Sequence, residues 1–189
     1  MVTPNRLADP HEYSEICEFA IENGAKYVLM NPLSSFGRGM KSKKILESPE
    51  EIMKKVHTET QSYRNKIELV PIRFPNKDKP LTSCHAGNIL YVFTNGDVTP
   101  CAYLSFAAEN PSSQYSPQEF TIGNIFNDID ITNKVKNYNF HNRFTLGNNP
   151  KCNSCELDTS CKKGCPAAVI ASGQKITGVD TDQCPVKDF

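Results

Sequence analysis

Cysteine is the residue type in this sequence whose number and spacing could support chemistry. The chain has eight cysteines, and four of them fall within one polar stretch, KCNSCELDTSCKKGC. These four are Cys152, Cys155, Cys161 and Cys165. The stretch offers almost no apolar residues to pack around buried thiols, and a spacing of two residues lets two sulfurs reach one metal centre. The cluster therefore predicts a metal-binding or redox site.

Two further cysteines flank a predicted β-hairpin. The apolar run at residues 89–94 is followed by Asn95-Gly96, and Asn-Gly before a second strand is a strong short-range hairpin signal, since both central residues of that turn need a positive φ. Cys84 precedes the first strand and Cys101 ends the second, so both sulfurs can arrive on the same side. Cys17, by contrast, lies alone on a predicted helix and is expected to be a core residue.

The composition excludes several classes of function. Lys plus Arg number 21 and Asp plus Glu number 21, so zero net charge gives no electrostatic basis for nucleic acid or membrane as a partner. The longest apolar run is far shorter than the roughly 20 residues that cross a bilayer. The first residues lack the apolar stretch of a signal peptide. We therefore expect a cytoplasmic protein, in a compartment where clustered cysteines bind metals more often than they form disulfides.

Residues 1–74 alternate between helical and strand patterns. A helix is expected from Asp9-Pro10 to Gly24, and a second one is expected to open at the capping box of Ser48 and Glu51. Residues 26–31 and 66–74 are predicted strands. This order indicates an α/β layer with parallel strands. Two such strands leave an edge unpaired, so we expect the missing strands in another chain or in a preceding part of a longer protein.

A second domain is expected after a polar, turn-forming linker at residues 75–80. Beyond the hairpin, residues 105–120 have the composition of a loop, and a short helix is expected at about 130–138. Another helix is expected to begin at Cys165-Pro166 and to end at Gly173. Because only 38% of the residues are apolar, the core must be small, and we expect metal centres to supply much of the folding free energy.

The second domain, residues 81–189, resembles the SPASM domain, the C-terminal iron–sulfur module of radical SAM enzymes that modify peptides and proteins. The likeness extends over about residues 81–186 and rests on seven cysteines, with Gly96 four residues before Cys101 and a Cys-x2-Cys-x5-Cys-x3-Cys run. Fragments such as Gly164-Cys165-Pro166-Ala167 match as well. Residues 1–74 are similar to the last units of the partial (β/α)6 barrel of these enzymes, and the loop containing Arg38 resembles the loop on the SAM side of the final strand.

The resemblance implies two auxiliary 4Fe–4S clusters, each of which normally takes four thiolates. Cys84, Cys101 and Cys165 would hold cluster I. Cluster II would be held by Cys152, Cys155, Cys161 and Cys184. Cluster I then lacks one cysteine. Its fourth iron would be open to substrate or water, or would bind an oxygen of Asp78 or a nitrogen of His85.

The sequence departs from the family where the family performs its chemistry. No Cys-x3-Cys-x2-Cys triplet, which would hold the SAM-cleaving cluster, is present. We therefore expect this chain to be the C-terminal part of a radical SAM enzyme, inactive alone, that needs S-adenosylmethionine and the missing N-terminal half to act on a peptide or protein substrate. Two alternatives remain: a stand-alone iron–sulfur electron-transfer protein, and a zinc-binding structural module completed by His85 or His141.

Overall fold

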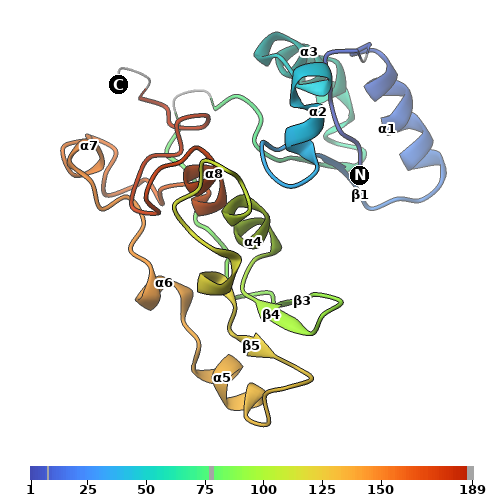
Figure 1. Cartoon of the computed structure of the whole chain (residues 1–189). Coiled ribbons are helices and arrows are strands. Elements are labelled where there is room, and N and C mark those ends of the chain that lie inside the picture. Colours follow the sequence, from blue (N-terminus) through green and yellow to red (C-terminus); the bar gives the residue numbers. More distant parts are fainter. Residues whose placement is uncertain (8, 77–78, 187–189) are drawn as a thin grey trace. The chain divides into compact units, whose positions relative to one another are not determined.

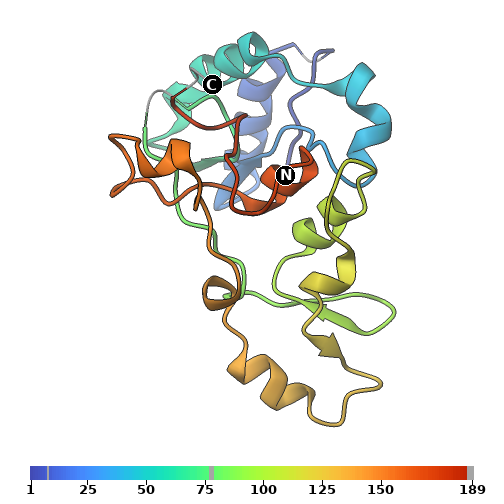
Figure 2. The same cartoon turned by 60° about the vertical axis from the view of Figure 1, so that its left-hand side comes forward.

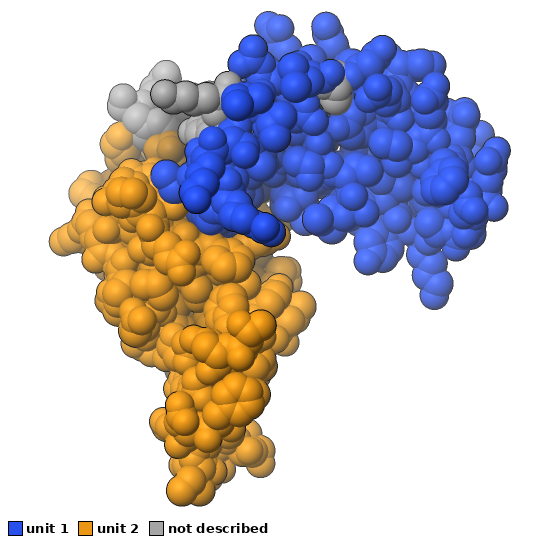
Figure 3. Space-filling model, turned by 45° about the vertical axis from the view of Figure 1, so that its right-hand side comes forward, with its two compact units in different colours: residues 1–77 blue, residues 78–189 orange. Residues whose placement is uncertain are grey.

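The computed structural model describes residues 1–7, 9–76 and 79–186. The chain divides into two compact units, Met1–Lys77 and Asp78–Phe189, which Figure 3 shows in separate colours. Both are small assemblies of short helices and short strands, so the protein is of the α+β type. No helix in the described ranges combines the length and the apolar character needed to cross a membrane.

The first unit is built around a pair of parallel strands (Figure 1). Its elements are α1 (Glu12–Glu22), β1 (Tyr27–Met30), α2 (Gly39–Leu46), α3 (Glu50–Thr60), the 3-10 turn η1 (Gln61–Tyr63) and β2 (Glu68–Pro71). Strands β1 and β2 pair in parallel from Tyr27 opposite Glu68 to Met30 opposite Pro71. Val2 forms a further parallel bridge with Met30. The predicted alternation of helix and strand is confirmed.

The core of the first unit lies where α1 and α3 meet the strands. Its buried residues are Tyr13, Cys17, Val28, Met30, Val56 and Ile67. Cys17 is fully buried, which confirms its prediction as a core residue, and burial raises the pKa of its thiol, with a smaller contribution from Glu18. Its sulfur is therefore a packing group and lies outside the cysteine-rich unit.

One local prediction for the first unit is wrong, and one helix was not predicted. Ser48 does not cap α3; the N-cap position is occupied by Pro49, and the Ser48 hydroxyl donates instead to the carbonyl of Pro4. Helix α2 was not expected, because the polar sequence GMKSKKIL leaves even Met40 and Ile45 exposed.

The second unit contains a small antiparallel sheet and several short helices. Its elements are β3 (Tyr91–Val92), β4 (Asp97–Thr99), α4 (Ala102–Ala108), the 3-10 turn η2 (Pro117–Phe120), β5 (Gly123–Asn124), α5 (Ile131–Asn137), α6 (Phe140–Arg143), α7 (Pro150–Asn153) and α8 (Pro166–Ala171). The strand order is β3-β4-β5. Figures 1 and 2 both show α5 beyond β5, at the opposite end of the unit from α8.

The hairpin of β3 and β4 is present, but its turn differs from the expected two-residue turn. Phe93 and Asp97 are joined by a backbone hydrogen bond of 2.9 Å, and the Gly96 N–H donates to the Phe93 carbonyl at 2.9 Å. Gly96 has a φ of 87°, whereas Asn95 is not in the left-handed region. A three-residue loop with glycine at its last position therefore replaces the turn in which both central residues need a positive φ.

Residues 105–120 are not simply a loop. Residues 102–108 form α4 because Leu104, Ala107 and Ala108 recur on one helical face and are buried, and α4 packs against α8. The amide of Asn110 and the hydroxyl of Ser112 both donate to the carbonyl of Ala171 at the end of α8. The predicted helices at 130–138 and after Cys165 are confirmed as α5 and α8.

Aromatic side chains form the apolar centre of the second unit. Phe120 is fully buried, and its ring centroid lies 5.7 Å from that of Tyr115 and 5.4 Å from that of Phe144. Phe144 in turn lies 5.3 Å from Phe140, which is also buried. These rings hold together segments that have little regular secondary structure.

Replacing Phe120 by alanine is expected to destabilise the second unit by about 3–5 kcal/mol, because the truncation leaves a cavity beside the rings of Tyr115 and Phe144. Urea unfolding of the anaerobically purified chain, followed by tyrosine fluorescence, measures this change. Phe126→Ala is the matched control, since the Phe126 side chain is 70% exposed. Equal midpoints for the two variants would contradict the assignment of the Phe120 ring to the core.

Candidate metal centre

The hairpin places Cys84 and Cys101 in neighbouring segments. Cys101 lies two residues after the end of β4, and the N–H of Gly87 donates to the carbonyl of the intervening Pro100 at 3.1 Å. This bond ties the turn after Cys84 to the residue before Cys101. The N–H of Ala86 donates to the Cys84 sulfur at 3.4 Å. The fold therefore brings together the two cysteines that the predicted hairpin was expected to join.

Cys165 reaches the same region through the packing of two helices. Cys101 is the N-cap of α4 and Cys165 is the N-cap of α8, and both have extended backbone conformations. Helices α4 and α8 pack against each other, and both views in Figures 1 and 2 show them side by side. Small side chains such as Ala107 and Ala167 are buried in this unit and allow a close approach of the two helices.

The loop between Cys161 and Cys165 is pinned to the segment before Cys84. The N–H of Lys162 donates to the carbonyl of Leu81 at 2.8 Å, and Ser83 forms an antiparallel bridge with Lys163. Three segments that are distant in sequence, ending at Cys84, Cys101 and Cys165, are thus joined by backbone bonds and helix packing.

The thiols of this first group influence one another electrostatically. The pKa of Cys84 is raised to about 11, mainly by burial and to a smaller extent by the negative charges of Cys165 and Cys101, whereas the hydrogen bond from the Ala86 N–H lowers it. Burial also raises the pKa of Cys101, with an additional contribution from the charge of Cys165. Cys84 is therefore a neutral thiol at neutral pH without metal, and a metal that binds it must displace a proton.

The other four cysteines form a second group around Cys184. Burial raises the pKa of the Cys184 thiol, and the negative charges of three further cysteines raise it as well. These are Cys152, Cys161 and Cys155. The N–H of Cys155 donates to the carbonyl of Cys152 at 3.2 Å, which closes the tight turn between them.

Asn149 orders the start of the second group. Its side-chain oxygen accepts from the Cys152 N–H at 3.0 Å, which makes Asn149 the N-cap of α7. Its amide nitrogen lies 3.3 Å from the Cys152 sulfur and donates to the carbonyl of Thr177 at 2.7 Å. Asn149 therefore positions Cys152 and links it to the segment that leads to Cys184.

Asp180 connects the two groups. Its side chain is almost completely buried, with 2% of the residue exposed. A carboxylate oxygen accepts from the N–H of Cys165 at 3.1 Å, and its backbone carbonyl accepts from the N–H of Cys184 at 2.8 Å. One residue thus fixes a cysteine of each group.

The turn at Gly164, directly before Cys165, leaves space for the side chain of Asp180. Gly164 has a φ of 73°, and a Cβ on it would lie 2.8 Å from a methyl carbon of Leu81 and 3.0 Å from the Asp180 carboxylate. Glycine is therefore required at this position both for the backbone conformation and for the space. Asp180, Asn149 and Lys163 were not recognised in the sequence; only the Asn-Pro pair at residues 149–150 is a recognisable helix-start signal.

The remaining predicted residues that the structure describes do not join either group. Asp78 lies outside the described residues. His85 is exposed, and its Nδ1 lies 3.5 Å from the amide nitrogen of Asn88, whereas His141 is exposed beside the ring of Phe140. Arg38 is exposed in the turn before α2 in the first unit. In the described part of the chain, no set of three or more His, Cys, Asp or Glu side chains is arranged to hold a single metal ion.

The donor chemistry of the two groups fits iron–sulfur clusters. Iron–sulfur clusters are held by cysteine thiolates that bind different irons, with hydrogen bonds to the sulfurs and local charge setting the potential. The chain offers thiols in groups of three and four, and N–H groups donate to the sulfurs of Cys84 and Cys152. Partial burial at both groups is consistent with a cluster that is shielded from bulk water.

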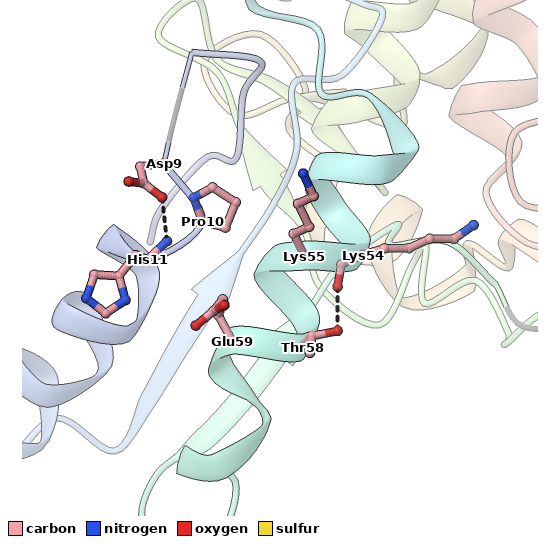
Figure 4. A pocket seen from close by; sticks show the side chains of 7 residues that line it. All are labelled: Asp9, Pro10, His11, Lys54, Lys55, Thr58 and Glu59. Atoms are coloured by element: carbon pink, nitrogen blue, oxygen red, sulfur yellow. Dashed lines mark hydrogen bonds between the residues drawn. The ribbon is translucent and has the colours of Figure 1, made fainter.

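A shallow pocket in the first unit contains none of the candidate ligands. It is lined by Asp9, Pro10, His11, Lys54, Lys55, Thr58 and Glu59, between the turn before α1 and helix α3 (Figure 4). Asp9 accepts from the His11 N–H at 3.0 Å, and Lys54 forms an ion pair with Glu50 at 2.7 Å. Asp9 therefore interacts with the turn that leads into α1, and Lys54 pairs with a neighbour on the surface of α3. The residues that line this pocket include no buried reactive group.

Comparison with known protein families supports the chemistry of the cysteine-rich unit. The family model described as an iron–sulfur cluster-binding domain, SPASM, matches residues 84–162. The matched segment contains Cys84, Cys101, Cys152, Cys155 and Cys161, while Cys165 and Cys184 follow it. No curated protein and no solved structure matches the chain.

Proposed function

We propose that this chain binds two auxiliary 4Fe–4S clusters, one held by Cys84, Cys101 and Cys165 and the other by the remaining four cysteines of the second unit. The observation that supports this most directly is the backbone bonding between the segments of Cys84, Cys101 and Cys165, since the Gly87 N–H donates to the Pro100 carbonyl and Ser83 forms a bridge with Lys163. The clusters would supply one-electron transfer to or from a bound substrate. The three-thiolate site leaves one iron for another ligand, with Asp78 as a candidate.

The first unit supports a place for this chain in a larger radical SAM enzyme. Its parallel strands β1 and β2, together with the bridge of Val2 to Met30, have the strand direction of a (β/α) barrel. Among the described residues β2 pairs with β1 alone, so its other edge is free to accept further strands. The partner would be an N-terminal half that holds the SAM-cleaving cluster and S-adenosylmethionine, with Arg38 on the SAM side.

The substrate of such an enzyme would be a peptide or protein side chain. The two-stranded hairpin of the second unit has β3 at the edge of its sheet, and Tyr91 and Val92 are exposed there. An extended peptide can pair with an edge strand of this kind through its backbone. This chain alone would bind clusters but not cleave SAM.

Metal analysis of the anaerobically purified chain tests the proposal. We expect about eight iron and eight acid-labile sulfide per chain, with absorbance near 400 nm, because each of two clusters holds four of each. About one to two zinc ions per chain, without sulfide, would replace the proposal by a structural zinc module. Full iron and sulfide in a chain that gains no activity with any N-terminal half would favour a stand-alone electron-transfer protein.

Single cysteine variants test the division into two groups. Cys84→Ala and Cys184→Ala are each expected to lose about half of the iron and one of two reduced-state EPR signals, with a different signal lost in each. Cys17→Ala is the control, because its thiol is buried in the first unit. Loss of the same signal in both variants would show that the cysteines are shared differently.

A further inference from the structure

Lys163 is held in one place by its backbone and by its neighbours. It has a φ of 71°, a left-handed conformation that is sterically unfavourable for a residue with a side chain. Its aliphatic stem lies against Gly147, where a Cβ would come within 2.5 Å of the Lys163 Cδ. Its ammonium group donates to the carbonyl of Asp158 at 3.2 Å and forms an ion pair with the Asp158 carboxylate. These contacts hold the positively charged ammonium group of Lys163 in a defined position.

The ammonium group of Lys163 lies beside the group of four cysteines. Asp158, which accepts from Lys163, lies in the loop between Cys155 and Cys161, and its N–H donates to the carbonyl of Cys155 at 2.9 Å. Lys163 itself follows Cys161 by two residues, so the hydrogen bond to Asp158 holds its ammonium group against the loop that carries Cys155 and Cys161. A lysine side chain is a cation at neutral pH. The side chain of Lys163 is 16% exposed and that of Asp158 is 42% exposed, so water screens the carboxylate more than the ammonium.

We propose that Lys163 is a built-in cation that raises the reduction potential of the cluster held by Cys152, Cys155, Cys161 and Cys184. This rests on the proposed cluster binding. A cluster with four thiolates has one more negative charge than a cluster with three, and its reduction by one electron adds another negative charge without taking up a proton. A fixed positive charge nearby stabilises the reduced form more than the oxidised form.

The consequence concerns the direction of electron transfer. Without a compensating cation, the four-thiolate cluster would be the harder of the two to reduce because of its larger negative charge. Lys163 reduces that difference in reduction potential, and so makes electron transfer from the three-thiolate cluster to the four-thiolate cluster more favourable than it would be without this cation. The two clusters would then form an ordered relay.

Redox titration of the anaerobically loaded chain, with mediators and EPR detection, tests this proposal. In Lys163→Gln we expect the equilibrium constant for one-electron reduction of the four-thiolate cluster to fall about tenfold, equivalent to about 59 mV. The EPR signal that is lost in Cys184→Ala identifies this cluster. The potential of the other cluster should change less.

Two further variants separate charge from structure. Lys162→Gln removes a charge of the same sign one residue away, on an exposed side chain, and should leave both potentials unchanged. Lys163→Gly removes the charge but favours the left-handed backbone, so it should fold at least as well as the parent and still lower the potential. Equal four-thiolate potentials in the parent and in Lys163→Gly would overturn the proposal.

The same samples distinguish this failure from failure of the proposed function. Iron and sulfide are measured before each titration. If the parent chain holds no iron–sulfur cluster, both the proposed function and the role of Lys163 are wrong. If both clusters are present and the Lys163 variants do not change the reduction potential of the four-thiolate cluster, cluster binding stands and the role of Lys163 is wrong.

Discussion

Removing iron from the anaerobically loaded chain is expected to unfold the cysteine-rich unit and to leave the first unit folded. The second unit has strands of only two or three residues, and the segments around its cysteines are mainly turns. Where metal ligands connect such segments, the free energy of metal binding becomes free energy of folding. The first unit has its own buried core around Val28, Met30 and Val56.

Hydrogen exchange with mass spectrometry measures the two units separately. After chelation under reducing conditions, amide protection should disappear in α8 and at the Cys184 N–H, which donates to Asp180. Protection should persist in β1 and β2. The control is the same treatment with chelator already saturated by iron. Retained protection of α8 after complete loss of iron would show that the aromatic core alone folds this unit.

Asp180→Ala is expected to reduce the occupancy of both clusters. The substitution leaves the Cys165 N–H without its acceptor, at a cost of about 1–3 kcal/mol, and it empties a buried position beside Gly164. Because the Asp180 backbone also accepts from Cys184, a shift of this residue moves one ligand of each group. Iron per chain should therefore fall by more than half, and both EPR signals should weaken.

Two matched variants make this result specific to the Asp180 carboxylate. Asp180→Asn keeps an oxygen acceptor in nearly the same volume, so its iron content should lie between those of the parent and Asp180→Ala. Asp182→Ala removes an exposed carboxylate two residues away and should retain full iron. Loss of only one EPR signal in Asp180→Ala would mean that the residue serves one site and not both.

The sequence predicted those parts of the fold that depend on local patterns. The apolar runs at β1 and β2, the hairpin signal at Asn95-Gly96 and the Cys165-Pro166 helix start all produce the expected elements, because their signals lie within a few residues. Only the type of turn in the hairpin differs. Helix α2 was missed because its polar sequence lacks a buried face. Helix α4 was missed because its small apolar residues become a helical face only against α8.

The same distinction applies to the candidate site. The seven cysteines stand out by residue type and spacing, whereas the groups that orient them do so through distant contacts. Asp180 reaches Cys165 across fifteen positions, and Asn149 reaches Thr177 across twenty-eight. An aspartate or an asparagine in a polar loop has no local signal for such a role. The left-handed conformation of Lys163 is likewise a product of its surroundings rather than of its residue type.

The pairing of Ser83 with Lys163 has a consequence for the order of events during synthesis. The segment that contains Cys84 emerges from the ribosome long before the residues that pin it in place. Cys184 emerges later still. During this interval the early thiols are exposed to oxidants and to stray metal ions, since closing a long loop must precede their burial. The two proposed clusters can therefore be completed only after Cys165 and Cys184, respectively, have been synthesised.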